Sequence, residues 1–362
     1  MQAGRFLSML LSLGLVLGSG FARAEEAPPV VRIATTAYVG FGNAGKVVGG
    51  NILTARIIQE KWLEARLKEH GVKLEWFPIT GDVGPVTNEA FAADRIDFAN
   101  IGDLPSIIVN AAGVRTQLIV PNGRGSNLYL IVPVNSAATS IKDLVGKRVS
   151  VQASRPWELG FRKLAQENGL KYSDFRIFNL APNASMAALT NGNVDAYFYT
   201  SGHLLEEKKI GKIIWSSEGA LEHKIRSSEL WGSKSFIDKY PEITQLIATA
   251  YVKAQYWTAQ DENRDAAIQE GTLNGTPESV VRRNYQDSAV AWRDHWSPLY
   301  DRYVTDYYRN ASAFAYDNKI IGRKLNADEL FQPKYLENAL AQLNLAQYWK
   351  PSPVKVAALG VK

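Results

Sequence analysis

Short apolar runs alternate with segments of helical periodicity along the first part of this chain. The apolar runs predict strands at residues 30–35, 73–79, 97–101, 116–120 and 128–134. Apolar residues at helical spacing predict helices over residues 52–69 and 86–93. The repeated unit is a strand followed by a helix, which favours a mostly parallel sheet with helices on its faces.

The same pattern begins again near residue 141. Strands are predicted at residues 148–152, 175–180, 194–200 and 212–215, with helices over 156–168, 185–190 and 204–209. After Ser217 the chain becomes largely helical, with predicted helices at 235–239, 241–260, 264–270, 277–285, 298–317 and 335–345. The pattern therefore predicts two α/β lobes and a helical C-terminal region.

One junction, residues 97–106, is typical of a ligand-binding position. A short buried strand turns through Gly102 into a helix start, where Asp103 can cap exposed amides and Pro105 suits the first turn. The free N–H groups of such a helix face whatever lies beyond the strand end. We expect an anion or a polar head group there, in the crevice where open α/β sheets bind ligands.

The N-terminus has the features of a secretory signal peptide. Residues 1–24 combine Arg5, an apolar run at 6–17 and the small-residue sequence Ala22-Arg23-Ala24. The chain has no cysteine, which excludes disulfides, thiolate metal sites and a lipid-anchored cysteine after the signal. We therefore expect a free periplasmic protein.

Charge and sulfur content narrow the choice of partner. Removing Arg5 and Arg23 with the signal lowers the formal charge from +5 to +3. This charge is spread without a basic run, so it does not favour nucleic acid, whereas a small anion fits it. Only one of the three methionines, Met186, would remain, and a protein made when sulfur is scarce gains by containing little sulfur.

The glycine-rich stretch at residues 40–47 matches G-x-G-x-x-G and nearly matches a phosphate-binding loop. Val47 stands where such a loop needs Ser or Thr for Mg²⁺, and residues 36–39 separate the stretch from the strand end. We interpret it as a glycine loop at the mouth of a cleft, and expect no cofactor.

Several motifs, in this order, resemble the periplasmic substrate-binding proteins of ABC importers for sulfonates, taurine and nitrate. They are Thr36-Ala37-Tyr38, Ile96-Asp97-Phe98, Ile101-Gly102-Asp103-Leu104-Pro105, Ile141-Lys-Asp-Leu-Val-Gly-Lys-Arg-Val149, Gly192-Asn-Val-Asp195-Ala196 and Phe236-Ile-Asp-Lys-Tyr-Pro-Glu242. The resemblance spans residues 30–243 and covers both predicted lobes.

The resemblance implies a two-lobed, type II α/β fold that closes on its ligand, with a helical C-terminal extension packed on lobe 1. Lobe 1 would comprise residues 25–121 and 222–362, and lobe 2 residues 122–221. It implies capture of a small organic sulfur anion, a sulfonate or sulfate ester, by a monomer that delivers it to a permease and ATPase complex in the inner membrane. The implied ligand contacts are Tyr38, Asp103, Leu104, Arg124, Ser126, Asn127, Ser154, Trp157, Thr200, Ser201 and His203.

Individual residues in this set keep more than one interpretation. Arg124 lies in a polar Gly-Arg-Gly-Ser loop and can contact an anion or be a solvated surface arginine, so its truncation should cost little packing. Ser154 can cap a helix, and Trp157 can belong to the core or form a wall against an organic tail, which we favour. Glu158 would repel an anion, so we expect it to face away, toward Arg155 or Arg162.

Other functions also remain open from the sequence. The ligand could be nitrate or another small molecule, and a periplasmic sensor lobe would look alike. A hydrolase acting on sulfate esters could use Ser201 and His203, although residues two apart at a strand end do not readily face each other. The four histidines show no metalloprotease spacing, and no nucleophile elbow is present.

Overall fold

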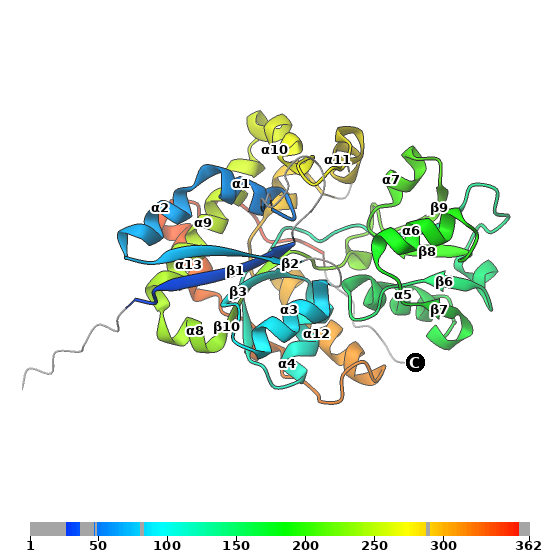
Figure 1. The fold of residues 1–362 in the computed structure, drawn as a ribbon, viewed down its shortest axis with the longest axis horizontal. Helices are drawn as coiled ribbons and strands as arrows, with labels where there is room; N and C mark the ends of the chain where they lie inside the picture. Colours follow the sequence, from blue (N-terminus) through cyan, green and yellow to red (C-terminus); the bar gives the residue numbers. More distant parts are fainter. Residues whose placement is uncertain (1–26, 37–46, 48, 80–82, 287–289, 355–362) are drawn as a thin grey trace, which may run out of the picture.

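Two sheets form the centres of two lobes in the computed structural model, which describes residues 27–36, 47, 49–79, 83–286 and 290–354 (Figure 1). The sheet of lobe 1 has the order β2-β1-β3-β10-β4. Its strands are β1 (Val30–Thr36), β2 (Lys73–Ile79), β3 (Phe98–Ile101), β4 (Thr116–Val120) and β10 (Glu229–Ser233). The sheet of lobe 2 has the order β7-β6-β8-β5-β9, with β5 (Tyr129–Pro133), β6 (Arg148–Ser150), β7 (Arg176–Phe178), β8 (Ala196–Tyr199) and β9 (Gly211–Ser216). The predicted two-lobed α/β fold is confirmed.

One internal strand of each sheet is antiparallel to both of its neighbours, although the repeated strand–helix pattern predicts mostly parallel sheets. In lobe 1, β10 lies between β3 and β4 and is antiparallel to both. In lobe 2, β5 is antiparallel to β8 and β9. The sequence prediction missed β10 because Glu-Leu-Trp-Gly-Ser shows no alternation: its residues are buried on both faces, and Glu229 is buried with an arginine partner.

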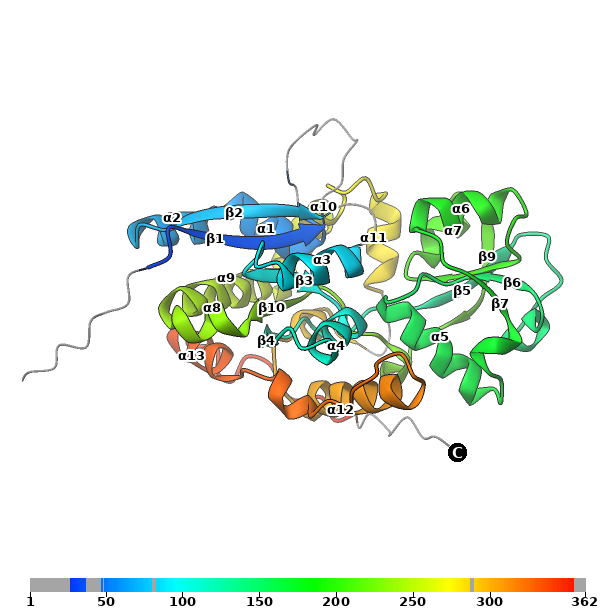
Figure 2. The same cartoon turned by 60° about the horizontal axis from the view of Figure 1, so that its bottom comes forward.

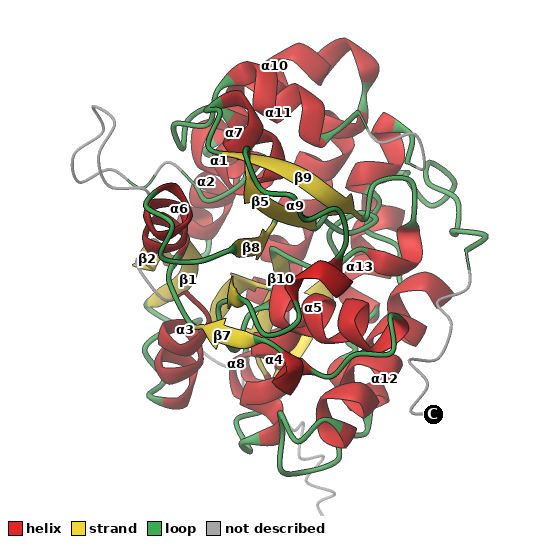
Figure 3. Cartoon of the chain, turned by 90° about the vertical axis from the view of Figure 1, so that its right-hand side faces the viewer, coloured by secondary structure: helices red, strands yellow, loops and turns green. Residues whose placement is uncertain are grey.

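Helices cover both sheets. Those that follow strands of lobe 1 are α1 (Ile52–Glu60), α2 (Trp62–Glu69), α3 (Val83–Ala92) and α4 (Asp103–Ala111); those of lobe 2 are α5 (Pro156–Glu167), α6 (Pro182–Thr190) and α7 (Gly202–Glu207). Figure 3 faces lobe 2 and shows α5 and α6 on opposite sides of its sheet. The C-terminal helices are α8 (Lys234–Lys239), α9 (Pro241–Ala259), α10 (Arg264–Gly271), α11 (Glu278–Asn284), α12 (Arg302–Asp317) and α13 (Lys334–Gln342). Short 3₁₀ helices lie at Ile141–Leu144, Tyr172–Asp174, Leu221–His223, Asp261–Asn263, Trp292–Trp296 and Ala327–Leu330.

The C-terminal helices pack on lobe 1, as predicted. Tyr251 of α9 and Leu336 of α13 belong to the same buried cluster as Ile33 of β1. On the other face of the sheet, Tyr308 of α12 packs with Ile107 of α4. This long return of the chain gives lobe 1 two apolar layers, and it leaves α11 beside α7 of lobe 2 (Figure 2).

Two predicted helices differ from the observed ones at points with a local cause. The helix predicted over residues 52–69 is divided into α1 and α2 because Lys61 takes a left-handed conformation, with φ of 56°. The helix predicted from residue 298 begins at Arg302, where the Asp301 side chain accepts a hydrogen bond from the Val304 amide at 3.2 Å.

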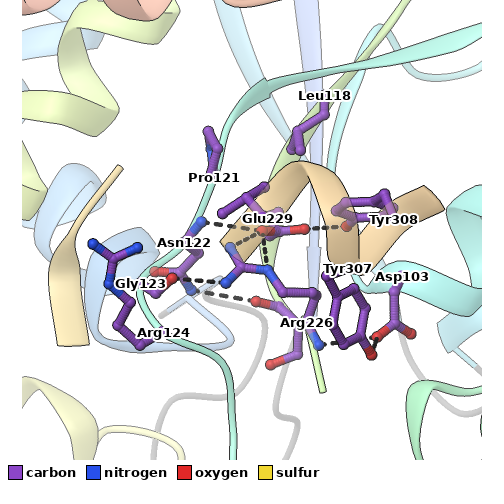
Figure 4. A network of polar contacts seen from close by, with 12 residues as sticks. Asp103, Leu118, Pro121, Asn122, Gly123, Arg124, Arg226, Glu229, Tyr307 and Tyr308 are labelled. Atoms are coloured by element: carbon purple, nitrogen blue, oxygen red, sulfur yellow. Dashed lines mark hydrogen bonds and ion pairs between the residues drawn. The ribbon is translucent and has the colours of Figure 1, made fainter. Parts of the chain in front are cut away.

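The lobes are joined by two crossings, residues 121–128 and 217–228, which pair with each other. The Ser126 amide donates to the Ile225 carbonyl at 2.8 Å, and the Ile225 amide donates back at 3.2 Å. Below this pairing the fully buried Arg226 donates to Glu229 Oε1 at 2.8 Å and to the Gly123 carbonyl at 2.7 Å (Figure 4). The expected lobe boundaries at 121/122 and 221/222 fall inside the crossings, and the exact domain limits stay a prediction.

Candidate functional site

A cavity of about 280 Å³ lies where the two lobes and the crossings meet. Its lining comes from the start of α1, both crossings, the β8–α7 junction of lobe 2, and the α10–α11 segment of lobe 1. The described lining residues are Gly50, Asn51, Ile52, Gly125, Ser126, Asn127, Tyr129, Tyr199, Thr200, Ser201, Leu204, Lys224, Gly271, Asn274, Thr276, Val280, Val281, Asn284, Tyr285 and His295. Four predicted contacts, Ser126, Asn127, Thr200 and Ser201, are therefore brought together in one cavity.

Hydroxyl and amide groups gather around one buried cation at the hinge. Lys224 is 2% exposed, lines the cavity, and its ammonium donates to Asn127 Oδ1. The Ser217 hydroxyl also lies 3.4 Å from Asn127 Oδ1, and the Ser126 and Ser227 hydroxyls are 2.7 Å apart. We call Ser126, Asn127, Thr200, Ser201 and Lys224 the pocket side of the cleft. Lys224 is the lysine among the described lining residues, and none of those described residues is Asp or Glu.

The first turn of α1 adds a second source of positive potential. Asn51 caps this helix: its side chain accepts from the Thr54 amide at 3.0 Å, and the Thr54 hydroxyl lies 3.3 Å from the Asn51 amide. No acidic residue occupies the first turn. Since Gly50, Asn51 and Ile52 line the cavity, the N-terminal end of the helix dipole favours a negative group there.

Apolar side chains form another part of the lining. Val280 and Val281 of α11 face the same cavity as Leu204 of α7. Tyr285 closes this part and is held in an aromatic cluster, with its ring centroid 5.6 Å from that of Trp292 and 5.1 Å from that of Trp296. The cavity therefore has a polar part at the hinge and an apolar part against α11.

His203 lies behind the wall of the cavity. Its Nε2 is 2.7 Å from Glu218 Oε1 and 3.1 Å from the hydroxyl of Tyr129, which donates to the same carboxylate oxygen at 3.0 Å. A Cβ on Gly202 would come within 2.4 Å of the Tyr129 ring, so glycine is needed for this packing. His203 thus positions a lining residue, and Glu218 is a member of the cluster that the sequence did not indicate.

Asp103 and Leu104 lie outside the cavity. Asp103 is completely buried and accepts from the Arg226 amide at 2.9 Å, the Leu104 amide at 2.5 Å and the Tyr307 hydroxyl at 2.5 Å. Burial raises the pKa of Asp103 from 3.8 to about 6, against the lowering effect of these hydrogen bonds. Leu104 is in the apolar core of lobe 1. The junction at residues 97–106 therefore fastens lobe 1 to the second crossing.

The helix starts next to this junction touch across the cleft. A Cβ on Gly102 would lie 2.4 Å from Pro156 Cγ, and one on Gly84 would lie 3.0 Å from the Ser154 carbonyl oxygen. We call Gly84, Gly102 and residues 154–156 the contact side of the cleft. Here glycine allows the two lobes to approach each other, and the expected anion position is occupied by the opposite lobe.

Ser154 and Trp157 have structural partners. Arg155, not Ser154, is the N-cap of α5, and the Ser154 amide donates to Glu158 Oε2 at 2.7 Å. Glu158 also accepts from Arg162 at 2.8 Å, so this carboxylate faces Arg162 as expected. Trp157 packs in the core of lobe 2, edge-on to Tyr199 at 4.7 Å, and Tyr199 takes the wall position that we expected for Trp157.

The contacts of Arg124 differ from those predicted. It is 3% exposed, its Nη1 lies 2.6 Å from Asp301 Oδ2, and its Nη2 donates to the Lys350 carbonyl at 2.9 Å. It is neither a solvated surface arginine nor part of the described cavity lining, and the expectation that truncating it costs little packing is wrong. The remaining predicted contact, Tyr38, lies outside the described residues.

The described residues also bear on metal sites and membrane spans. No group of three or more His, Asp or Glu side chains among them is arranged to hold a metal ion. None of their helices has both the length and the apolar character needed to cross a bilayer.

Comparison with known proteins identifies the family to which this architecture belongs. The profile of the NMT1/THI5-like family matches residues 67–264. A crystal structure from Methylobacillus flagellatus KT, described as the periplasmic sulfonate-binding protein SsuA of a sulfonate ABC transporter, is 40% identical, covers 92% of this chain and 100% of its own, and has a TM-score of 0.79. An Escherichia coli K12 protein described as aliphatic sulfonates-binding is 26% identical and covers 92% of this chain and 98% of its own length.

A third protein shows the same fold at lower identity. The alkanesulfonate-binding protein SsuA of Xanthomonas axonopodis pv. citri, solved with MOPS, is 19% identical over 84% of this chain and 98% of its own, with a TM-score of 0.68. The family profile, the 40% identical structure and the two five-stranded sheets all indicate the same family and fold. The chain is a member of the NMT1/THI5-like family and has the fold of the periplasmic substrate-binding proteins of ABC importers.

Proposed function

We propose that the cavity binds an organic sulfonate or sulfate ester and that the protein delivers it to an ABC importer for sulfur acquisition. The observation that carries this proposal is the group of hydroxyl and amide side chains around Lys224. A sulfonate has three acceptor oxygens and one diffuse charge, which suit several neutral donors and one cation. The names of the sulfonate-binding relatives support the same ligand class.

The apolar part of the cavity favours an organic anion over nitrate. A ligand whose charged group lies near Lys224 would place its tail against Val280, Val281 and Leu204. Burying each CH₂ group of that tail contributes about 0.8 kcal/mol, which nitrate cannot gain. The volume of about 280 Å³ suits a small ligand. The single methionine that would remain after signal cleavage is consistent with synthesis under sulfur limitation.

Replacing Lys224 by methionine tests the proposal, because methionine keeps much of the side-chain volume and removes the charge. We expect binding of pentanesulfonate to weaken roughly ten- to a hundredfold, the loss of one charge-assisted hydrogen bond. Lys212→Met is the matched control, since its ammonium donates to the Ser136 carbonyl at 2.7 Å and does not line the cavity. Calorimetric titration gives the affinities, and melting temperatures without ligand report on folding.

A ligand panel distinguishes the alternatives. Methanesulfonate, pentanesulfonate, benzenesulfonate, taurine, an alkyl sulfate, inorganic sulfate and nitrate are titrated under one condition. Tight binding of nitrate alone would refute the sulfur ligand. Release of sulfate from the alkyl sulfate would support a hydrolase instead, although His203 Nε2 already contacts Glu218 and Tyr129.

The proposal extends to location and partners: the protein is exported, cleaved after residue 24, free in the periplasm as a monomer, and docks on a permease with its ATPase. The signal-peptide pattern of residues 1–24 supports export, and the name of the periplasmic sulfonate-binding relative supports the location. Mass spectrometry of the protein recovered from the periplasm tests the cleavage position. Light scattering tests the monomer.

A further inference from the structure

Helix α11 has two different faces, one toward the cavity and one toward lobe 2. Val280, Val281 and Asn284 line the cavity. Ser279 and Arg283, which are four residues apart on the other face of the helix, contact α7 of lobe 2. Figure 2 shows α11 standing between the body of lobe 1 and the α6–α7 part of lobe 2. The residues that line the cavity and those that contact the other lobe therefore belong to one helix of seven residues.

The contacts with α7 are polar and cross the cleft. Arg283 Nη2 lies 2.9 Å from Glu206 Oε2, and the Ser279 hydroxyl donates to Glu207 Oε2 at 2.5 Å. Helix α7 directly follows Thr200 and Ser201, which lie on the pocket side. A movement of lobe 2 away from α11 would break both contacts and widen the cavity between Leu204 and Val280.

We propose that α11 is a latch that sets ligand affinity by holding the lobes closed. This inference rests on the proposed function, because it concerns the same cavity. Ligand binding that requires closure is strengthened by any contact formed only in the closed state. Arg283 and Ser279 supply such contacts without touching the ligand, whereas Val280 and Val281 select the tail.

The neighbouring arginine provides a matched control. Arg282 lies 2.7 Å from Asp265 Oδ1 and 2.7 Å from Glu278 Oε1, both within the α10–α11 part of lobe 1. Its side chain is 37% exposed, compared with 43% for Arg283. Arg282→Glu and Arg283→Glu therefore change the charge of the same helix equally, and only the second places a carboxylate opposite Glu206.

The first measurement is the distance between the lobes without ligand. Because the natural chain has no cysteine, Ala266→Cys on α10 and Lys208→Cys at the end of α7 can carry the only two spin labels. We expect Arg283→Glu to shift the distance distribution to longer values, and Arg282→Glu to leave it unchanged. This result does not depend on which ligand the protein takes.

The second measurement is the affinity for pentanesulfonate. Arg283→Ala should weaken binding about two- to fivefold, the range for an exposed ion pair, and Arg283→Glu should weaken it further. High salt should reduce the difference in pentanesulfonate affinity between the natural protein and Arg283→Ala, because it screens the ion pair. Equal distance distributions in the natural protein and Arg283→Glu would overturn the latch; a shifted distribution without any sulfonate binding would retain the latch and reject the proposed ligand.

Discussion

The two sides of the cleft use similar residues for different purposes. On the contact side, the helix starts near Gly102 and Pro156 approach so closely that a single Cβ would collide, and Asp103 is buried among Arg226, Leu104 and Tyr307. On the pocket side, Thr200 and Ser201 also precede a helix, yet a cavity separates them from lobe 1. Both kinds of strand–helix junction therefore face the other lobe. A junction can bind a ligand only where a cavity separates it from that lobe.

Replacing Arg124, which belongs to neither side of the cleft, gives the largest expected effect on stability. Arg124→Ala would leave Asp301 buried without its guanidinium partner, since each side chain of this ion pair is only 4% exposed. We expect the free energy of unfolding to fall by about 3–5 kcal/mol, the usual cost of breaking a buried pair. Urea denaturation measures it. A fully stable variant with weaker sulfonate binding would return Arg124 to the ligand site.

The buried carboxylate of the contact side predicts a pH effect. Because burial raises the pKa of Asp103 to about 6 in the folded protein, the folded state holds its proton more tightly than the unfolded state does. Its contribution to stability is complete below pH 3.8 and is lost as the pH rises through about 6. Over that range it amounts to about 3 kcal/mol.

Asp103→Asn should remove this pH dependence. The unfolding free energies of both proteins are measured between pH 4 and pH 7, and the difference between the two proteins is followed as the pH rises. We expect the natural protein to lose stability relative to the variant as the pH rises. Parallel profiles would show that Asp103 is ionised throughout and that the contact side is more solvated than its burial indicates.

A smaller effect is expected from Gly102→Ala, which tests the close approach of the lobes. The added Cβ would meet Pro156 Cγ at 2.4 Å and the Arg226 carbonyl oxygen at 2.9 Å. Overpacking of this kind costs about 1–3 kcal/mol, and here it is relieved by separating the lobes. We expect weaker pentanesulfonate binding and a larger radius of gyration by X-ray scattering. Gly322→Ala is the control, since nothing lies within 4 Å of its added Cβ.

Local patterns in the sequence predict most elements of the fold. Apolar runs located β1, β2 and β4 within one residue at each end, and the helical periodicity located α9 and α10 equally well. The fold class itself came from motifs in order along the chain. β10 could not be predicted in this way, because the partners that let Glu229 be buried in an internal strand are Arg226, Tyr308 and the Asn122 amide, which the local pattern does not show.

The site was predictable only in part, because burial is a long-range property. Thr200 and Ser201, which the family resemblance implied as ligand contacts, line the cavity. Lys224 gave no local signal: it lines the cavity because the second crossing runs back along the first through the pairing of Ser126 with Ile225. For the same reason Arg124, in a polar glycine loop, gave no sign of its partner Asp301, which lies 177 residues later.

A crystal structure with pentanesulfonate would locate the anion on one side of the cleft or the other. We predict sulfonate oxygens within hydrogen-bond distance of Lys224 and of hydroxyls from Ser126, Thr200 or Ser201, with the alkyl chain against Val280 and Val281. A sulfonate bound at the helix starts of Asp103 and Ser154, with the pocket side empty, would contradict it.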